Sequence, residues 1–144
     1  MNYSSIITNL YFMLIIADGK ISDKEIASGD QMINIEAINE TEFKVQMEGL
    51  KSKDQTALLS ECLSGLRKLS RAQQIRIIAW LCVVANADGF MDRAEWQLIY
   101  RIYHKELDLP LEEIFKVQKE LGRLTLEKSS LISKLNTLSD QPII

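Results

Sequence analysis

Two stretches of the chain are apolar on every face of a helix. Residues 5–17 carry no charged side chain, and residues 75–87 carry only Arg76. A helix that is hydrophobic all round belongs in the interior of a fold, because it has no polar face to turn toward water. The pattern therefore predicts two buried helices, at 5–17 and 75–87, that pack against each other at the centre of the molecule.

Other segments show amphipathic periodicity, with apolar residues three or four positions apart. The clearest examples are Leu58, Leu59, Cys62, Leu63 and Leu66; Trp96, Ile99, Ile102, Tyr103 and Leu107; and Leu124, Leu131, Leu135 and Leu138. A further helix begins near Pro110, since proline is tolerated in the first helical turn. We predict an all-α, single-domain bundle of six to eight helices without a β-sheet, followed by a loose tail at 140–144.

Polar motifs mark where several of these helices begin and end. In a capping box, two side chains three residues apart bond each other's backbone amides; the pattern occurs as Ser22 with Glu25, Ser70 with Gln73, and Asp92 with Glu95. Gly19 and Gly89 are expected to end the two buried helices, because glycine tolerates positive φ. Gly29 lies inside a predicted helix that ends near residue 37, which indicates that another helix approaches closely there.

The two halves of the chain match each other. The segment Ala17 to Glu25 aligns with Ala87 to Glu95 at an offset of 70 residues. In both copies an apolar helix leads into an Ala-Asp-Gly turn, a capped helix and a short third helix, which we interpret as an internal duplication. The predicted parts are repeat one at about 5–50, a connecting helix at about 54–68, repeat two at about 70–122, and a C-terminal helix and tail at about 123–144.

Both turns follow the pattern A-D-G-x-[I/M]-[S/D]-x-x-E, and over residues 6–122 the chain resembles the TerB-like family, named for tellurite-resistance proteins. The resemblance implies an all-helical domain of the kind found in stress-response operons and attached to some J-domain co-chaperones. It also implies that the acidic residues of the turns gather divalent cations, and it implies no reaction. The chain carries no J-domain signature.

Six carboxylates lie in or just after the two turns: Asp18, Asp23, Glu25, Asp88, Asp92 and Glu95. Oxygen-only ligands select hard ions such as Ca²⁺, Mg²⁺ or Mn²⁺, so a cation site forms if the fold brings both turns together. An EF-hand is excluded, because apolar Leu14, Ile16 and Val84 stand where such a loop needs oxygen ligands. The alternative interpretation is structural: the aspartates close turns and the glutamates complete capping boxes.

Composition argues against several other classes of function. A net charge of −3 and a pI near 5.2 do not suit nucleic-acid binding, which needs a basic face. The apolar run at 10–17 is too short to cross a membrane and lacks the basic flank of a secretory signal, so we expect a cytoplasmic protein. Cys62 and Cys82 fit as small buried hydrophobes, and His104, the only histidine, fits as a surface residue without a nucleophile beside it.

These observations favour a non-enzymatic stress-response and interaction domain that binds partner proteins, and they leave open whether the paired acidic turns also bind a hard divalent cation. Its partner would be a protein of unknown identity, and a homodimer stays open. Two alternatives are a metal-dependent hydrolase that uses the same carboxylates, and a structural adaptor with neither metal nor chemistry. The position of the six carboxylates in the fold bears on all three.

Overall fold

The fold consists of helices and short connections. The structure, a computed structural model, describes the backbone of residues 1–139 and the side chains of residues 1–127; the predicted tail at 140–144 lies outside the described residues. Within residues 1–139 there are seven α-helices, one π-helical segment and no strand, which confirms the predicted all-α bundle. The elements are α1 (Tyr3–Ile15), α2 (Asp23–Ile35), α3 (Glu40–Leu50), α4 (Gln55–Lys68), α5 (Arg71–Ala85), α6 (Arg93–Tyr100), η1 (Arg101–Glu106) and α7 (Leu111–Ser139).

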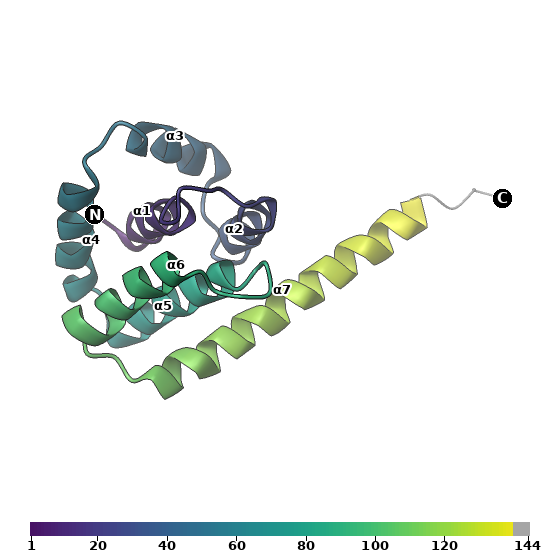
Figure 1. The fold of residues 1–144 in the computed structure, drawn as a ribbon. Helices are drawn as coiled ribbons and strands as arrows, with labels where there is room; N and C mark the ends of the chain where they lie inside the picture. Colours follow the sequence, from purple (N-terminus) through teal and green to yellow (C-terminus); the bar gives the residue numbers. More distant parts are fainter. Residues whose placement is uncertain (140–144) are drawn as a thin grey trace.

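Helices α1 and α5 lie in contact at the centre of the bundle, as their all-round apolar character predicts (Figure 1). Ile6, Leu10 and Trp80 have no exposed surface. Helices α3 and α4 contact α1, while α2, α6 and α7 contact α5. None of the helices in the described part of the chain has both the length and the apolar character needed to cross a membrane.

A half-buried ion pair between Glu36 and Arg76 joins the start of α1 and the end of α2 to α5. The Glu36 carboxylate accepts hydrogen bonds from the Tyr3 hydroxyl (2.6 Å) and the Trp80 indole Nε1 (2.8 Å). It also accepts from Nε (2.6 Å) and Nη2 (3.0 Å) of Arg76. Burial alone raises the pKa of Glu36, but the hydrogen bonds from Arg76, Tyr3 and Trp80 outweigh it and hold the pKa below its usual value. This carboxylate is satisfied within the chain and therefore has a structural role.

The close approach expected at Gly29 is confirmed. The Tyr11 side chain of α1 lies directly over this glycine, so a Cβ atom built there would overlap the Tyr11 hydroxyl and ring. The same hydroxyl donates a hydrogen bond to the Glu25 carbonyl oxygen (3.1 Å), which keeps the ring in place. Glycine at position 29 thus leaves room for the Tyr11 side chain of α1 against α2.

We expect Gly29→Ala to destabilise the domain by ~1–3 kcal/mol in urea denaturation, because overpacking outweighs the gain of about 1 kcal/mol in helix propensity. Gly49→Ala is the matched control: Gly49 also lies in a helix, but a Cβ atom there meets nothing within 4 Å. The control variant should be as stable as the wild type or more stable. Equal stability of the two variants would show that Tyr11 moves aside without cost.

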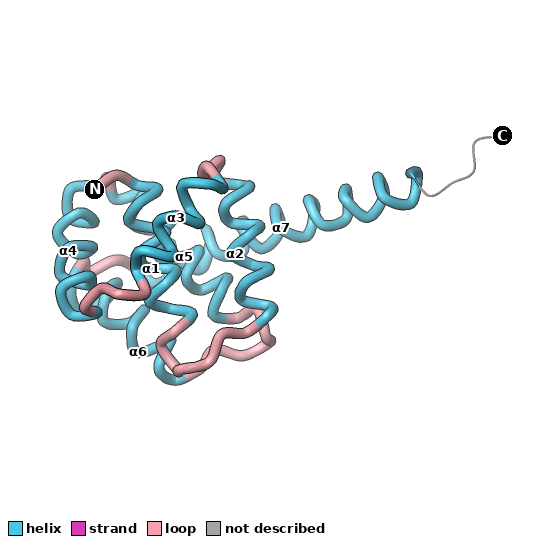
Figure 2. Tube along the Cα trace, turned by 90° about the horizontal axis from the view of Figure 1, so that it is seen from above, coloured by secondary structure: helices cyan, strands magenta, loops and turns pink. Residues whose placement is uncertain are grey.

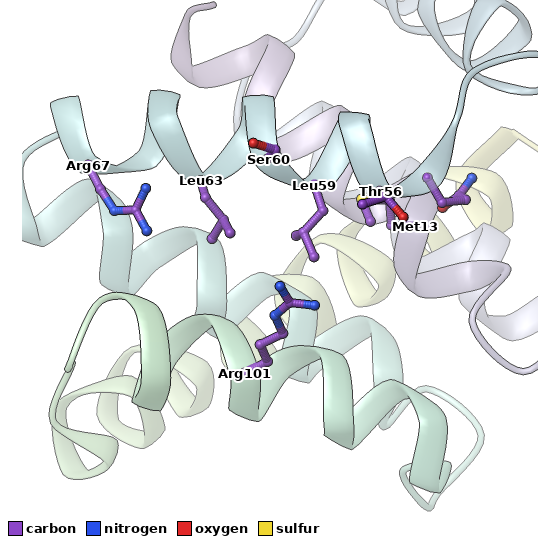
Figure 3. Close-up of a pocket in the computed structure, with 8 residues that line it drawn as sticks. Met13, Thr56, Leu59, Ser60, Leu63, Arg67 and Arg101 are labelled. Carbon is purple, nitrogen blue, oxygen red and sulfur yellow. The ribbon is translucent and has the colours of Figure 1, made fainter.

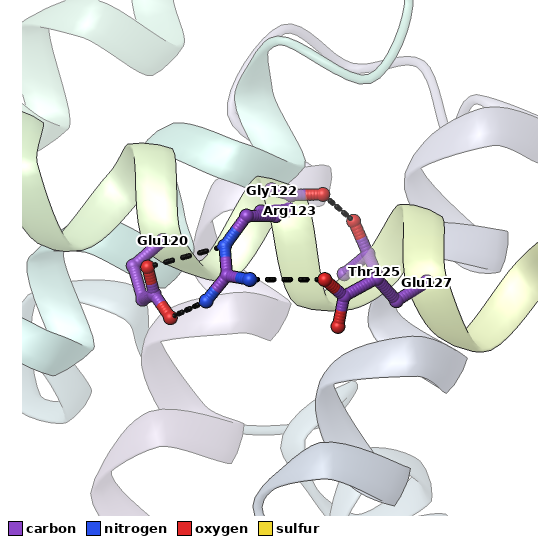
Figure 4. Close-up of polar contacts among 5 residues, drawn as sticks. All are labelled: Glu120, Gly122, Arg123, Thr125 and Glu127. Atoms are coloured by element: carbon purple, nitrogen blue, oxygen red, sulfur yellow. Dashed lines mark hydrogen bonds and ion pairs between the residues drawn. The ribbon is translucent and has the colours of Figure 1, made fainter.

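Helix α7 is longer than the sequence pattern indicates. A boundary was expected near residue 123, yet one helix runs without interruption from Leu111 to Ser139 and extends past the bundle (Figure 1). Local contacts bridge the expected boundary: Arg123 pairs with Glu120 and with Glu127 (2.9 Å), and the Thr125 hydroxyl donates to the Gly122 carbonyl oxygen (2.8 Å; Figure 4). Pairs at this spacing support a continuous helix. The predicted apolar positions at 131, 135 and 138 lie outside the described side chains.

Candidate metal centre

The two Ala-Asp-Gly turns lie side by side at one end of the bundle (Figure 2). Gly19 and Gly89 have φ values of 78° and 93°, the left-handed conformation that glycine adopts without strain. A hydrogen bond joins the turns directly, from the Ser22 hydroxyl to Asp88 Oδ1 (2.9 Å). Because these two residues are 66 positions apart in the chain, the contact depends on the packing of α1 against α5.

A cavity of about 420 Å³ opens between the two turns. It is lined by Asp18, Lys20, Ile21, Ser22, Glu25, Asp88, Phe90, Asp92 and Glu95; this cavity is called the acidic pocket below. Five of the six carboxylates singled out from the sequence therefore meet. The sixth, Asp23, is exposed in the first turn of α2 and does not line the pocket.

Backbone amides and the Ser22 hydroxyl orient the three aspartates. Asp18 Oδ1 accepts from the backbone N–H of Lys20 (2.9 Å), and Asp92 Oδ1 accepts from that of Ala94 (2.8 Å). Asp88 Oδ1 is held by the Ser22 hydroxyl, as described above. Each aspartate is thus fixed through one oxygen, and the second oxygen of each carboxylate can accept a further ligand. The turn geometry therefore orients the three aspartates in the absence of a cation.

The two glutamates form the inner wall of the pocket. Glu25 and Glu95 are only 3% and 5% exposed, and the Oε2 atom of each is buried with no hydrogen-bond partner in the described structure. A buried carboxylate oxygen without a partner is unfavourable, because nothing replaces the water it has lost. A proton shared between Glu25 and Glu95, or a cation in the pocket, would supply the missing partner, so these two atoms mark the pocket as the candidate site.

The capping-box interpretation of Glu25 is wrong. Ser22 Oγ does accept from the backbone amides of Lys24 (3.2 Å) and Glu25 (3.4 Å), so the serine half of the motif is present. The Glu25 carboxylate does not return the bond to Ser22 and is buried at the pocket wall instead. The Ser70 motif, by contrast, forms the complete box with Gln73. The same three-residue spacing therefore gives a complete capping box at Ser70 and Gln73 but a buried pocket carboxylate at Glu25. The surroundings of the residue three positions after the serine decide which of the two forms.

Electrostatics at the inner wall disfavour two ionised glutamates. Burial, the hydrogen bond and charge of Glu25, and the charge of Asp18 raise the pKa of Glu95 to about 8, although the backbone amide of Asp92 opposes the shift. Without a cation, Glu95 keeps its proton at neutral pH. A positive ion in the pocket would favour the ionised form.

The separations between ligand atoms suit a hard cation. One carboxylate oxygen from each of Asp18, Asp92 and Glu95 lies within 4.8 Å of the others. Two oxygens on opposite sides of a Ca²⁺ ion are about 4.8 Å apart, since each Ca–O bond is ~2.4 Å long. Each pair of these oxygens is therefore no farther apart than two ligands of one Ca²⁺ ion, and the three groups, which come from both turns, are candidate ligands of a shared cation. The all-oxygen ligand set selects Ca²⁺, Mg²⁺ or Mn²⁺ over softer metals.

A second cavity, of about 370 Å³, lies between α4 and the α6–η1 segment (Figure 3). Leu59, Leu63 and Arg67 line it from α4, and Arg101 lines it from η1. Both arginines pair with Glu106, at 2.7 and 3.8 Å, so their charge is partly neutralised within the chain. Glu106 is the last residue of η1, a π-helical segment where the sequence predicted a plain α-helix. This cavity contains no orphaned buried group and is the weaker candidate site.

Comparison with known protein families matches residues 5–117 to the family described as tellurite resistance protein TerB. A comparison with curated proteins finds no match, and a comparison with solved structures finds none. The matched region includes both turns and every residue of the acidic pocket. Because the match covers well over half of the chain, this chain belongs to the TerB family.

Proposed function

We propose that the acidic pocket binds one hard divalent cation, Ca²⁺, Mg²⁺ or Mn²⁺, and that this TerB domain acts as a non-enzymatic, cation-dependent interaction module. The ligands would be Asp18, Asp92 and Glu95, with Glu25 and Asp88 at the edge of the coordination shell. The observation that carries the proposal is the pair of buried, unpartnered Oε2 atoms of Glu25 and Glu95. A cation would provide positive charge beside these buried oxygens in place of the proton that Glu95 otherwise keeps.

The arrangement supports a role for the ion in coupling the two turns. Asp18 lies after α1, while Asp92 and Glu95 lie at the start of α6. An ion shared by these groups would hold two segments that otherwise touch through the Ser22–Asp88 hydrogen bond. The bound state would thus have a more rigid end of the bundle than the ion-free state, which is how a cation can change the affinity of a domain for a partner.

Thermal melts in EDTA and in millimolar Ca²⁺, Mg²⁺ or Mn²⁺ test the proposal. An ion at 100 times its Kd should stabilise the wild type by roughly 2.7 kcal/mol, which raises the melting temperature by roughly 5–10 °C in a domain of this size. Asp18→Asn, Asp88→Asn and Asp92→Asn should each lose most of that rise. In EDTA these variants should be at least as stable as the wild type, because each removes a like charge.

Asp23→Asn is the matched control, because Asp23 lies beside the pocket in sequence and outside it in the fold. This variant should keep the full ion-induced rise. If no ion raises the wild-type melting temperature above the rise seen in the Asp92→Asn variant, the cation proposal fails and a structural adaptor remains. If the ion-loaded protein also hydrolyses phosphate esters, the hydrolase alternative replaces the non-enzymatic one.

A further inference from the structure

Two large apolar side chains are exposed at the mouth of the acidic pocket. Ile21 is 60% exposed and Phe90 is 70% exposed, and both line the pocket opening. They belong to different turns: Ile21 follows Gly19 by two residues, and Phe90 follows Gly89 directly. An apolar pair beside a polar cavity is a typical feature of a surface that binds a partner.

The charge around this apolar pair limits the chemistry of the partner. Five carboxylates line the pocket, while Lys20 contributes the positive charge among its lining residues. A bound divalent ion neutralises only part of this excess, so the mouth stays negative with or without the ion. A cationic partner is attracted to such a surface, and an acidic segment or an anionic lipid headgroup is repelled.

We propose that the mouth of the acidic pocket docks a protein segment in which a lysine or arginine stands next to a large apolar residue. The apolar side chain packs on Ile21 and Phe90, and the cationic side chain faces the carboxylates that the ion leaves uncompensated. The proposal rests on the cation site proposed above. Ile21 and Phe90 belong to different turns, and an ion bound to both turns would fix the distance between these two side chains.

The test measures binding of a fluorescein-labelled amphipathic peptide of leucine and lysine to the full chain by fluorescence anisotropy, with saturating ion and with EDTA. Phe90→Ser and Ile21→Ser should each weaken binding by about tenfold, the effect of losing one buried apolar side chain. Neither residue is an ion ligand, so both variants should keep the ion-induced rise in melting temperature. Val45→Ser is the control, because Val45 is 69% exposed on α3, away from the pocket, and it should bind as the wild type does.

A matched peptide of leucine and glutamate tests the charge argument and should bind at least about tenfold more weakly than the lysine peptide. Equal binding of the two peptides, equal binding by Phe90→Ser and Val45→Ser, or binding in EDTA that is at least as tight as binding with the ion would overturn the docking inference. Preferential binding to vesicles of anionic phospholipid would overturn it in favour of a lipid surface. If the ion-induced rise is present and docking is absent, only this inference fails; if the rise itself is absent, the proposed function fails.

Discussion

Replacing Trp80 by alanine should destabilise the domain by ~3–5 kcal/mol, the usual effect of truncating a large aromatic residue in a close-packed core. Trp80 lies on α5, has no exposed surface and donates from its indole Nε1 to Glu36 Oε1. The substitution therefore leaves a cavity beside α1 and removes one donor from a buried carboxylate. Urea denaturation of the two proteins gives the free-energy difference directly.

Trp80→Phe separates the contribution of core packing from that of the hydrogen bond to Glu36. Phenylalanine keeps most of the apolar volume but has no donor, so a loss of ~1–3 kcal/mol is expected, the effect of an unmet hydrogen bond at a buried acceptor plus a small packing defect. Arg76 and Tyr3 still bond Glu36 in this variant. A loss below about 1 kcal/mol for Trp80→Ala, the size typical of surface positions, would contradict the central position of α5.

Without divalent ions, the domain should lose stability as the pH rises from about 4.5 to about 8. The folded-state pKa of Glu95 is raised to about 8 from a usual value of 4.5, so the folded protein keeps a proton that the unfolded chain releases. Its contribution is complete below the unfolded pKa and is lost as the pH rises through the folded pKa. The groups that face Glu95 are Glu25 from α2, Asp18 from the first turn and the backbone amide of Asp92. The expected difference is on the order of a few kcal/mol.

Denaturation in EDTA at several pH values measures this loss, and Glu95→Gln is the diagnostic variant. Glutamine has no proton to release in this range, so the decline with pH should become much shallower. Glu112→Gln, an exposed carboxylate at the start of α7, should leave the wild-type profile unchanged. If Glu95→Gln follows the same profile as Glu112→Gln, burial at the inner wall of the pocket does not govern the titration.

The fold links the apolar centre of the bundle to the acidic pocket at its end. Because α1 and α5 pack together, the turns that follow them emerge at the same place, and the carboxylates of both turns face one cavity. The backbone of Glu25 is also joined to α1, since Gly29 admits Tyr11, whose hydroxyl donates to the Glu25 carbonyl oxygen. Core packing and the proposed cation site are thus parts of one arrangement.

Much of the architecture could be predicted from residue patterns, because the distribution of apolar residues around a helix indicates which of its faces are buried. Residues 5–17 and 75–87 are apolar all round, and this alone indicates two central helices. The Ser70 cap and the positive φ of Gly19 and Gly89 were also predictable, since they depend on a few neighbouring residues. The two glycines lie in the turns after α1 and α5, whereas the helices themselves end earlier, at Ile15 and Ala85. The interruption expected near residue 123 was wrong, because Arg123 and its neighbours support a continuous α7.

Which carboxylates line the acidic pocket could not be predicted from such residue patterns. Asp23 and Glu25 are two residues apart and equally acidic, yet only Glu25 lines the pocket. The capping spacing suggested that Glu25 bonds the backbone of its own helix, whereas the structure buries its carboxylate at the inner wall of the pocket, where it interacts with Glu95. By itself the sequence determined the helices, the turns and the set of carboxylates, because these follow from local spacing. Which carboxylates meet, and which of them are buried against each other, was decided by the tertiary packing of α1 against α5. Groups 66 or more residues apart are brought together only when distant segments fold onto each other.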